Sequence, residues 1–191
     1  MKAGVLAEEV GEGLRSWRAR ALDRLEGLDD DEYFWTPVPG CWSVRRADNG
    51  RWSADLGPRG NTRTPDGPPP VTTIAWRLWH LGGCPNPAWP PADASSPREF
   101  ADRWFTRTPQ DSADAFGTAA EAIAAFDRHG TAVADSVVGF TDTDLLTAVG
   151  PGGGRFGGGS IHGLVLHVAD ELIHHGAEIG ILRDLYRAGM R

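Results

Sequence analysis

The segment 162–187, HGLVLHVADELIHHGAEIGILRDLYR, holds four of the six histidines of the chain. On a helical wheel with about 100° per residue, seven apolar residues of this region fall in one arc that must face the core. They are Ile161, Leu164, Val168, Leu172, Ile179, Leu182 and Tyr186. Glu171 and His175 lie inside this arc or at its edge, at the i, i+4 spacing that stacks two side chains on one helix face. Because burial of an unpaired carboxylate is costly, a core-facing Glu171 needs a partner. Two ligands at this spacing can chelate one metal ion.

A third ligand should come from another helix. His80 is the best candidate, because it is the one histidine of the segment 71–81, VTTIAWRLWHL, whose nearly continuous apolar character predicts a buried helix. The set His80, Glu171 and His175 would supply two nitrogens and one carboxylate and leave coordination positions open, as in catalytic sites. Such a set suits Zn²⁺, Ni²⁺ or Fe²⁺, and ligand type alone does not separate these ions.

The spacing also fits a plainer interpretation, in which Glu171 and His175 form a structural ion pair and His80 is a hydrogen-bonded core residue. Glu178 and His174 are candidates to support the ligands or to face the substrate. For Arg183 a surface salt bridge is favoured over a pairing with a carboxylate near the end of the helix. Cys84 could be a fourth ligand, but Gly82-Gly83 should end the helix before it, so an inert thiol is favoured. Cys41 is expected to be a packing residue rather than a nucleophile. No Ser/His/Asp or Cys/His arrangement for nucleophilic catalysis stands out. The catalytic group is therefore expected to be a metal-bound water or thiol.

The positions of the prolines indicate which segments can be helical. All but one of the 14 prolines lie between positions 37 and 109, so 1–36, 110–150 and 152–191 are free to form long helices. Apolar residues recur in them at spacings of three and four, and Ser160 is placed to cap the last helix. With the segment 71–81, the sequence predicts four helices and an all-α fold.

The remaining segments are expected to be loops. Residues 37–70 and 83–109 are proline-rich and irregular, and Asn49-Gly50 predicts a small β-hairpin near 44–55. The glycine-rich stretch 150–159 lacks the Lys-Ser/Thr pair of a phosphate-binding loop and is predicted to be a flexible linker.

Composition limits the function classes. The 191 residues include 19 Lys and Arg against 26 Asp and Glu, and the net charge of -7 argues against a nucleic-acid partner. No apolar run is long enough to span a membrane, and glutamates near the N-terminus interrupt any signal peptide. Two cysteines are too few for a disulfide framework. These features predict one cytoplasmic domain over residues 1–191.

Several segments together resemble the DinB-like superfamily, which includes YfiT-type proteins. The matching pieces are an aromatic-rich N-terminal helix, WTPVPGCWSV, TTIAWRLWHL and HVADELIHHGAEIGILRDLY. The family's usual ending has a histidine, a second histidine four residues on, and then Arg-Gly-Gln. Glu171 stands at the first of these histidines and His175 at the second, followed by Gly176, Ala177 and Glu178. A carboxylate at the first position is similar to the His, Glu, His zinc set of mycothiol-dependent maleylpyruvate isomerases.

The resemblance implies an up-down-down-up four-helix bundle with a divalent metal in a pocket between helices, and a possible homodimer. By this similarity the expected metal is zinc, with nickel and iron as alternatives. The resemblance also implies a thiol S-transferase or isomerase that acts on a small-molecule substrate and uses mycothiol or a similar low-molecular-weight thiol as cosubstrate. In such an enzyme the metal lowers the pKa of the thiol and the cosubstrate supplies the nucleophile. Two alternatives stay open: a non-catalytic bundle that binds a metal or small ligand, and non-haem iron oxygen chemistry, which also uses two histidines and one carboxylate.

Overall fold

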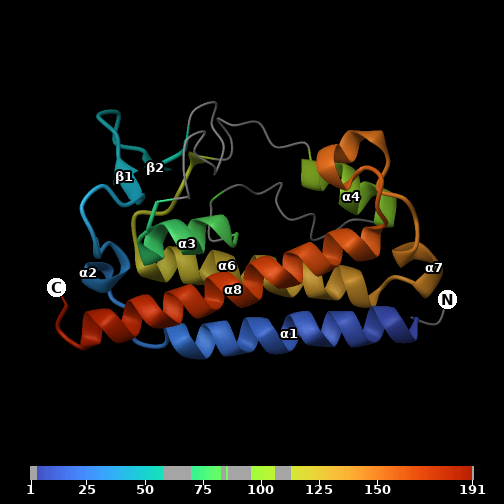
Figure 1. Ribbon diagram of the computed structural model, residues 1–191, viewed down its shortest axis with the longest axis horizontal. Helices are drawn as coiled ribbons and strands as arrows, with labels where there is room; N and C mark the ends of the chain where they lie inside the picture. Colours follow the sequence, from blue (N-terminus) through green and yellow to red (C-terminus); the bar gives the residue numbers. More distant parts are fainter. Residues whose placement is uncertain (1–3, 58–69, 83–84, 86–95, 106–112, 191) are drawn as a thin grey trace. The chain divides into compact units, whose positions relative to one another are not determined.

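A computed structural model describes residues 4–57, 70–82, 85, 96–105 and 113–190. These residues are mostly helical, and the sheet that they contain is one antiparallel pair of short strands. The predicted all-α fold is therefore confirmed (Figure 1). None of the described helices combines the length and the apolar character that a membrane crossing requires.

The chain divides into two compact units, the first made of residues 1–20, 87–107 and 128–174, and the second of 21–86, 108–127 and 175–191. Three long helices contribute residues to both units: α1 (Val5–Leu25), α6 (Ala119–Val138) and α8 (Ile161–Arg187). The four predicted helices correspond to these three and to α3 (Ile74–His80).

The first unit has a core of buried apolar side chains. They come from α1, α4 (Pro97–Phe105), α6, α7 (Asp142–Leu145) and α8, and include Leu14, Phe100, Val137, Leu145 and Leu164. The predicted apolar arc of the last helix supplies Ile161 and Leu164 to this core, and both are fully buried. Burial of this apolar surface holds the N-terminal half of α8 in place.

The second unit contains the predicted hairpin and the short buried helix. Strands β1 (Val44–Arg46) and β2 (Trp52–Ala54) pair in antiparallel register, and Gly50 takes the positive φ of 81° that the turn requires. Helix α3 begins after Thr73, whose hydroxyl accepts a hydrogen bond from the Trp76 amide. A short helix, α2 (Asp30–Tyr33), follows α1.

Two segments predicted to be irregular contain helical turns. Helix α4 lies in the proline-rich segment 83–109. This helix tolerates Pro97 because the residue occupies the first helical position, where a backbone N–H has no partner within the helix. Ser96 caps the helix by accepting a hydrogen bond from the Glu99 amide. The glycine-rich stretch includes the 3-10 helix η2 (Pro151–Phe156) and is held by backbone hydrogen bonds, such as that from Val149 N to Gly159 O at 2.9 Å. The interpretation of this stretch as a flexible linker was wrong.

The expectation of a surface salt bridge for Arg183 was also wrong, since this residue is only 1% exposed. Its guanidinium donates hydrogen bonds to both carboxylate oxygens of Glu32, on α2, at 2.9 and 3.0 Å. It also donates to the backbone carbonyls of Glu26, at 3.0 Å, and Arg24. Arg183 thus joins α8 to the end of α1 and to α2 within the second unit.

Candidate metal centre

Helix α8 places Glu171 and His175 one turn apart. It begins at Ile161, directly after Ser160, whose hydroxyl accepts from the Gly163 amide at 3.3 Å, so the predicted cap is confirmed. The helix continues unbroken to Arg187. Because its geometry is regular over this length, the i, i+4 spacing becomes a shared face.

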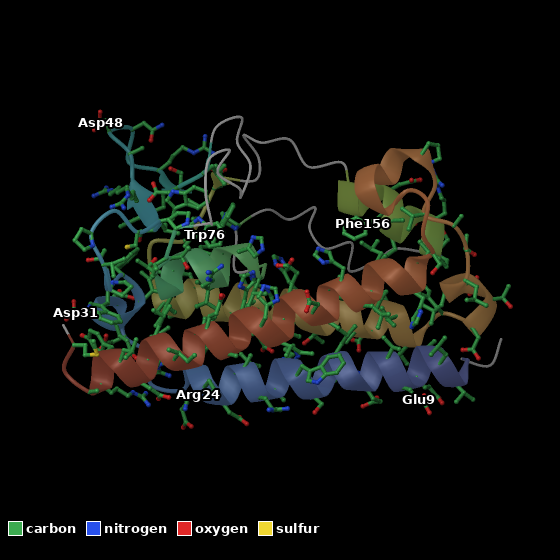
Figure 2. The ribbon with its side chains drawn as sticks, viewed as in Figure 1. Glu9, Arg24, Asp31, Asp48, Trp76 and Phe156 are labelled. Atoms are coloured by element: carbon green, nitrogen blue, oxygen red, sulfur yellow. The ribbon has the colours of Figure 1, made fainter. Side chains whose placement is uncertain are left out.

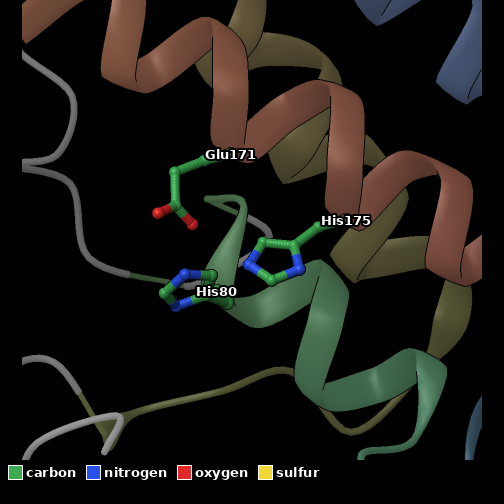
Figure 3. A group of neighbouring side chains, drawn as sticks. All are labelled: His80, Glu171 and His175. Carbon is green, nitrogen blue, oxygen red and sulfur yellow. The ribbon is translucent and has the colours of Figure 1, made fainter.

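The structure brings the three predicted ligands together. His80, Glu171 and His175 each offer one ligand atom, and these atoms lie within 4.8 Å of one another. Figure 3 shows the three side chains pointing toward a common point. His175 is buried, and the other two are half-buried.

The ring of His80, the last residue of α3, is held by aromatic neighbours. It stacks on Trp76 with the ring centroids 5.1 Å apart and an interplanar angle of 13°. Trp76, labelled in Figure 2, is itself anchored because its Nε1 donates to the Asp55 carbonyl at 2.8 Å. The His80 and His175 rings meet edge to face, with 4.9 Å between their centroids. The orientation of His80 therefore follows from packing within the second unit.

His175 is oriented by a polar contact with the next turn of α8. Its Nδ1 lies 2.5 Å from Glu178 Oε2, and the same oxygen lies 2.9 Å from Nε of Arg77, on α3. The opposite edge of the imidazole ring, with Nε2, faces Glu171 and His80 (Figure 3). Glu178 thus contacts a predicted ligand, and its role as a supporting residue stays a prediction.

The second supporting candidate, His174, is turned toward its own helix. Its Nδ1 lies 2.6 Å from the Asp170 carbonyl, and its Nε2 lies 4.0 Å from Glu171 Oε2. His167 Nε2 is nearer to the same carboxylate, at 3.4 Å from Oε1. Sequence reasoning gave His167 no role, although its i, i+4 spacing to Glu171 was visible. Arg77 was missed because nothing local to α3 indicates its contact with Glu178.

The donor set fits a divalent cation of intermediate softness. Neutral imidazole and ionised carboxylate are ligands of Zn²⁺, Ni²⁺ and Fe²⁺. Ligand atoms that share one such ion at bond lengths near 2.1 Å lie roughly 3–4 Å apart. Separations within 4.8 Å are close to this range, so small side-chain rotations would complete the contact.

Cys41 is not part of this cluster and is poorly suited to be a nucleophile. It is 3% exposed, and burial raises the pKa of its thiol, which disfavours the reactive thiolate. The other cysteine, Cys84, lies outside the described residues. The inertness of Cys41 stays a prediction, which its burial and raised thiol pKa support.

Comparison with known families is decisive for ancestry. The family model of the DinB superfamily matches residues 14–179, which is most of the chain. The chain belongs to the DinB superfamily. The matched region of this DinB-superfamily protein includes His80, Glu171 and His175. No curated protein and no solved structure matches the chain significantly.

Proposed function

We propose that this DinB-superfamily protein is a divalent-metal-dependent enzyme whose metal ligands are His80, Glu171 and His175. We further propose that it is a thiol S-transferase or isomerase that acts with a low-molecular-weight thiol of the mycothiol type. The observation that supports the proposal is the convergence of two imidazoles and one carboxylate, with ligand atoms within 4.8 Å. Three protein ligands leave positions open for a thiol or water, which is typical of catalytic sites.

The chain's own residues would bind and orient the reacting groups rather than attack the substrate. A bound divalent cation would lower the pKa of a coordinated thiol, so that its thiolate exists at neutral pH. Cys41 cannot take this role readily, because it is buried and the pKa of its thiol is raised. The nucleophile is therefore proposed to enter with the cosubstrate, while Trp76 holds His80 and Glu178 holds His175.

The ligand assignment is tested by metal content. The purified wild type and the His80→Ala and His175→Ala variants are loaded with Zn²⁺, desalted and analysed by mass spectrometry. We expect about one ion per chain in the wild type and strong loss in both variants. His162→Ala is the matched control, because it removes a histidine of α8 that is not in the cluster. Undiminished stoichiometry in both ligand variants would refute the assignment.

The reaction class is tested with mycothiol and an electrophile such as monochlorobimane, in the presence of the zinc-loaded protein. The proposal expects conjugation faster than with zinc alone, and this acceleration should be lost in His175→Ala. A rate equal to that of the metal-only control would count against a thiol transferase.

The donor set is also compatible with non-haem iron oxygen chemistry. Two histidines and one carboxylate also form the iron site of non-haem oxygenases. Iron that co-purifies with the protein, together with oxygen consumption, would favour this function over thiol transfer. A zinc site whose coordination does not change on thiol addition, with no turnover, would instead favour a non-catalytic metal-binding bundle.

A further inference from the structure

We propose that Arg77 is a positioning residue that clamps the Glu178 carboxylate and thereby selects the tautomer of His175 that exposes the Nε2 lone pair. The inference rests on the proposed metal-binding role of His175. It concerns side chains of the second unit alone, on α3 and on the last part of α8.

One oxygen atom receives both contacts. Glu178 Oε2 lies 2.5 Å from His175 Nδ1 and forms an ion pair with Arg77, 2.9 Å from its Nε, without the alignment of a hydrogen bond. An ionised carboxylate can accept hydrogen bonds but cannot donate them. Beside the positive charge of Arg77, the short contact therefore requires that His175 Nδ1 carries the proton and donates it. In a neutral imidazole this places the lone pair on Nε2.

The exposures of the two side chains indicate that Arg77 fixes the position of the Glu178 carboxylate. The Glu178 side chain is 42% exposed, so without a partner its carboxylate can rotate away from His175 into water. The Arg77 side chain is only 14% exposed, and its guanidinium lies 5.2 Å from the centre of the Trp76 ring. A cation held between an aromatic face and a carboxylate has little freedom to move. Arg77 thus provides the rigid side of the contact, and Glu178 the mobile side.

Trp76 connects this clamp with the other imidazole. The same ring that lies beside the Arg77 guanidinium stacks on His80, with centroids 5.1 Å apart. Residues Trp76 and Arg77 are adjacent on α3, so one turn of this helix orients both imidazoles of the candidate centre. Outer partners of metal-binding histidines fix the tautomer and the ring direction in this way.

The test combines a tautomer measurement on the metal-free protein with a zinc affinity. Protein labelled with ¹⁵N-histidine is studied by long-range ¹H–¹⁵N correlation NMR in mildly alkaline buffer with EDTA, and His175→Ala identifies the His175 signals. We expect the Nδ1–H tautomer in the wild type and a substantial Nε2–H population in Arg77→Met. Zn²⁺ affinity, from competition with a chelator, should fall by about 10–100-fold.

Two further variants keep the test interpretable. Glu178→Met removes the acceptor from a half-exposed side chain of similar length and should shift the tautomer in the same direction, even if Arg77→Met folds poorly. Arg51→Met is the matched control, since it removes an exposed arginine paired with Asp114 and should change neither measurement.

The outcomes separate this inference from the proposed function. A tautomer of His175 that is unchanged in both Arg77→Met and Glu178→Met would overturn the inference, even where the wild type binds zinc tightly. A shifted tautomer in a protein that binds no zinc would support the clamp and refute the metal centre. A shift accompanied by the weaker zinc affinity would support both.

Discussion

Replacement of Arg183 by methionine should strongly destabilise the second unit. Methionine keeps a flexible apolar side chain of similar length but removes the guanidinium, which donates to both Glu32 oxygens and to the carbonyls of Glu26 and Arg24. Glu32 is 4% exposed, so its carboxylate would stay buried and lose its hydrogen-bonded cation, with only the half-exposed Arg187 nearby, whose Nε lies 4.0 Å from Oε1.

The magnitude follows from which group is left without compensation. Removal of one partner of a buried ion pair typically costs about 3–5 kcal/mol of unfolding free energy, and we expect this loss for Arg183→Met. Glu32→Gln should cost less, about 1–2 kcal/mol, because the guanidinium keeps two backbone acceptors and the amide oxygen. The double variant should be no less stable than Arg183→Met, because a neutral glutamine tolerates burial better than an unpaired carboxylate.

Urea unfolding followed by circular dichroism measures these losses. Arg24→Met is the matched control, since it breaks an ion pair with Asp184 whose side chains are 45% and 66% exposed, and such pairs contribute about 1 kcal/mol or less. If Arg183→Met costs no more than this control, or if the two changes at Arg183 and Glu32 are additive, the account of a coupled buried pair is refuted.

Three further results are expected. Zn²⁺ at about 100 times its dissociation constant should raise the unfolding free energy by about 2.7 kcal/mol, measured as a melting temperature that EDTA lowers again; a melting temperature that zinc leaves unchanged would contradict binding to the folded state. Gly176→Ala should stabilise the protein by up to about 1 kcal/mol, because alanine has a higher helix propensity than glycine. The added Cβ fits, since it would lie at an ordinary 3.8 Å from the Ala21 Cβ; a lower melting temperature would show that α8 cannot accept it. In a Cys84→Ser background, Cys41 should react with a thiol reagent far more slowly in the native protein than in urea at neutral pH, since burial shields the thiol and raises its pKa; equal rates would contradict its burial.

Features that depend on neighbours in the chain could be predicted well. The Ser160 cap, the hairpin around Gly50 and the shared face of Glu171 and His175 are all confirmed, because each depends on local backbone geometry. His80 was chosen as a third ligand from the apolar character of its helix, and the structure places it beside His175. The ligand role of these residues remains a prediction.

Local reasoning failed where one residue type has opposite meanings in different contexts. The prolines of 83–109 predict a loop, yet Pro97 begins α4, since proline is tolerated in the first turn of a helix. Within the segment 110–150, for which a long helix is predicted, the structure has α6. This helix begins only at Ala119, directly after Thr118, whose hydroxyl accepts a hydrogen bond from the Glu121 amide.

Spacing along one helix is a property of the amino-acid order alone, so the juxtaposition of Glu171 and His175 needed no tertiary information. The environment of a charged side chain is different, because its burial depends on segments that arrive from elsewhere in the chain. Arg183 is buried only because Glu32 and the end of α1 meet it, 151 residues away in the case of Glu32. Arg77 likewise gained its contact with Glu178 only when α3 packed beside the last turns of α8. Tertiary packing therefore decided which charged side chains contact the candidate centre, while the local sequence decided that Glu171 and His175 share one face of α8.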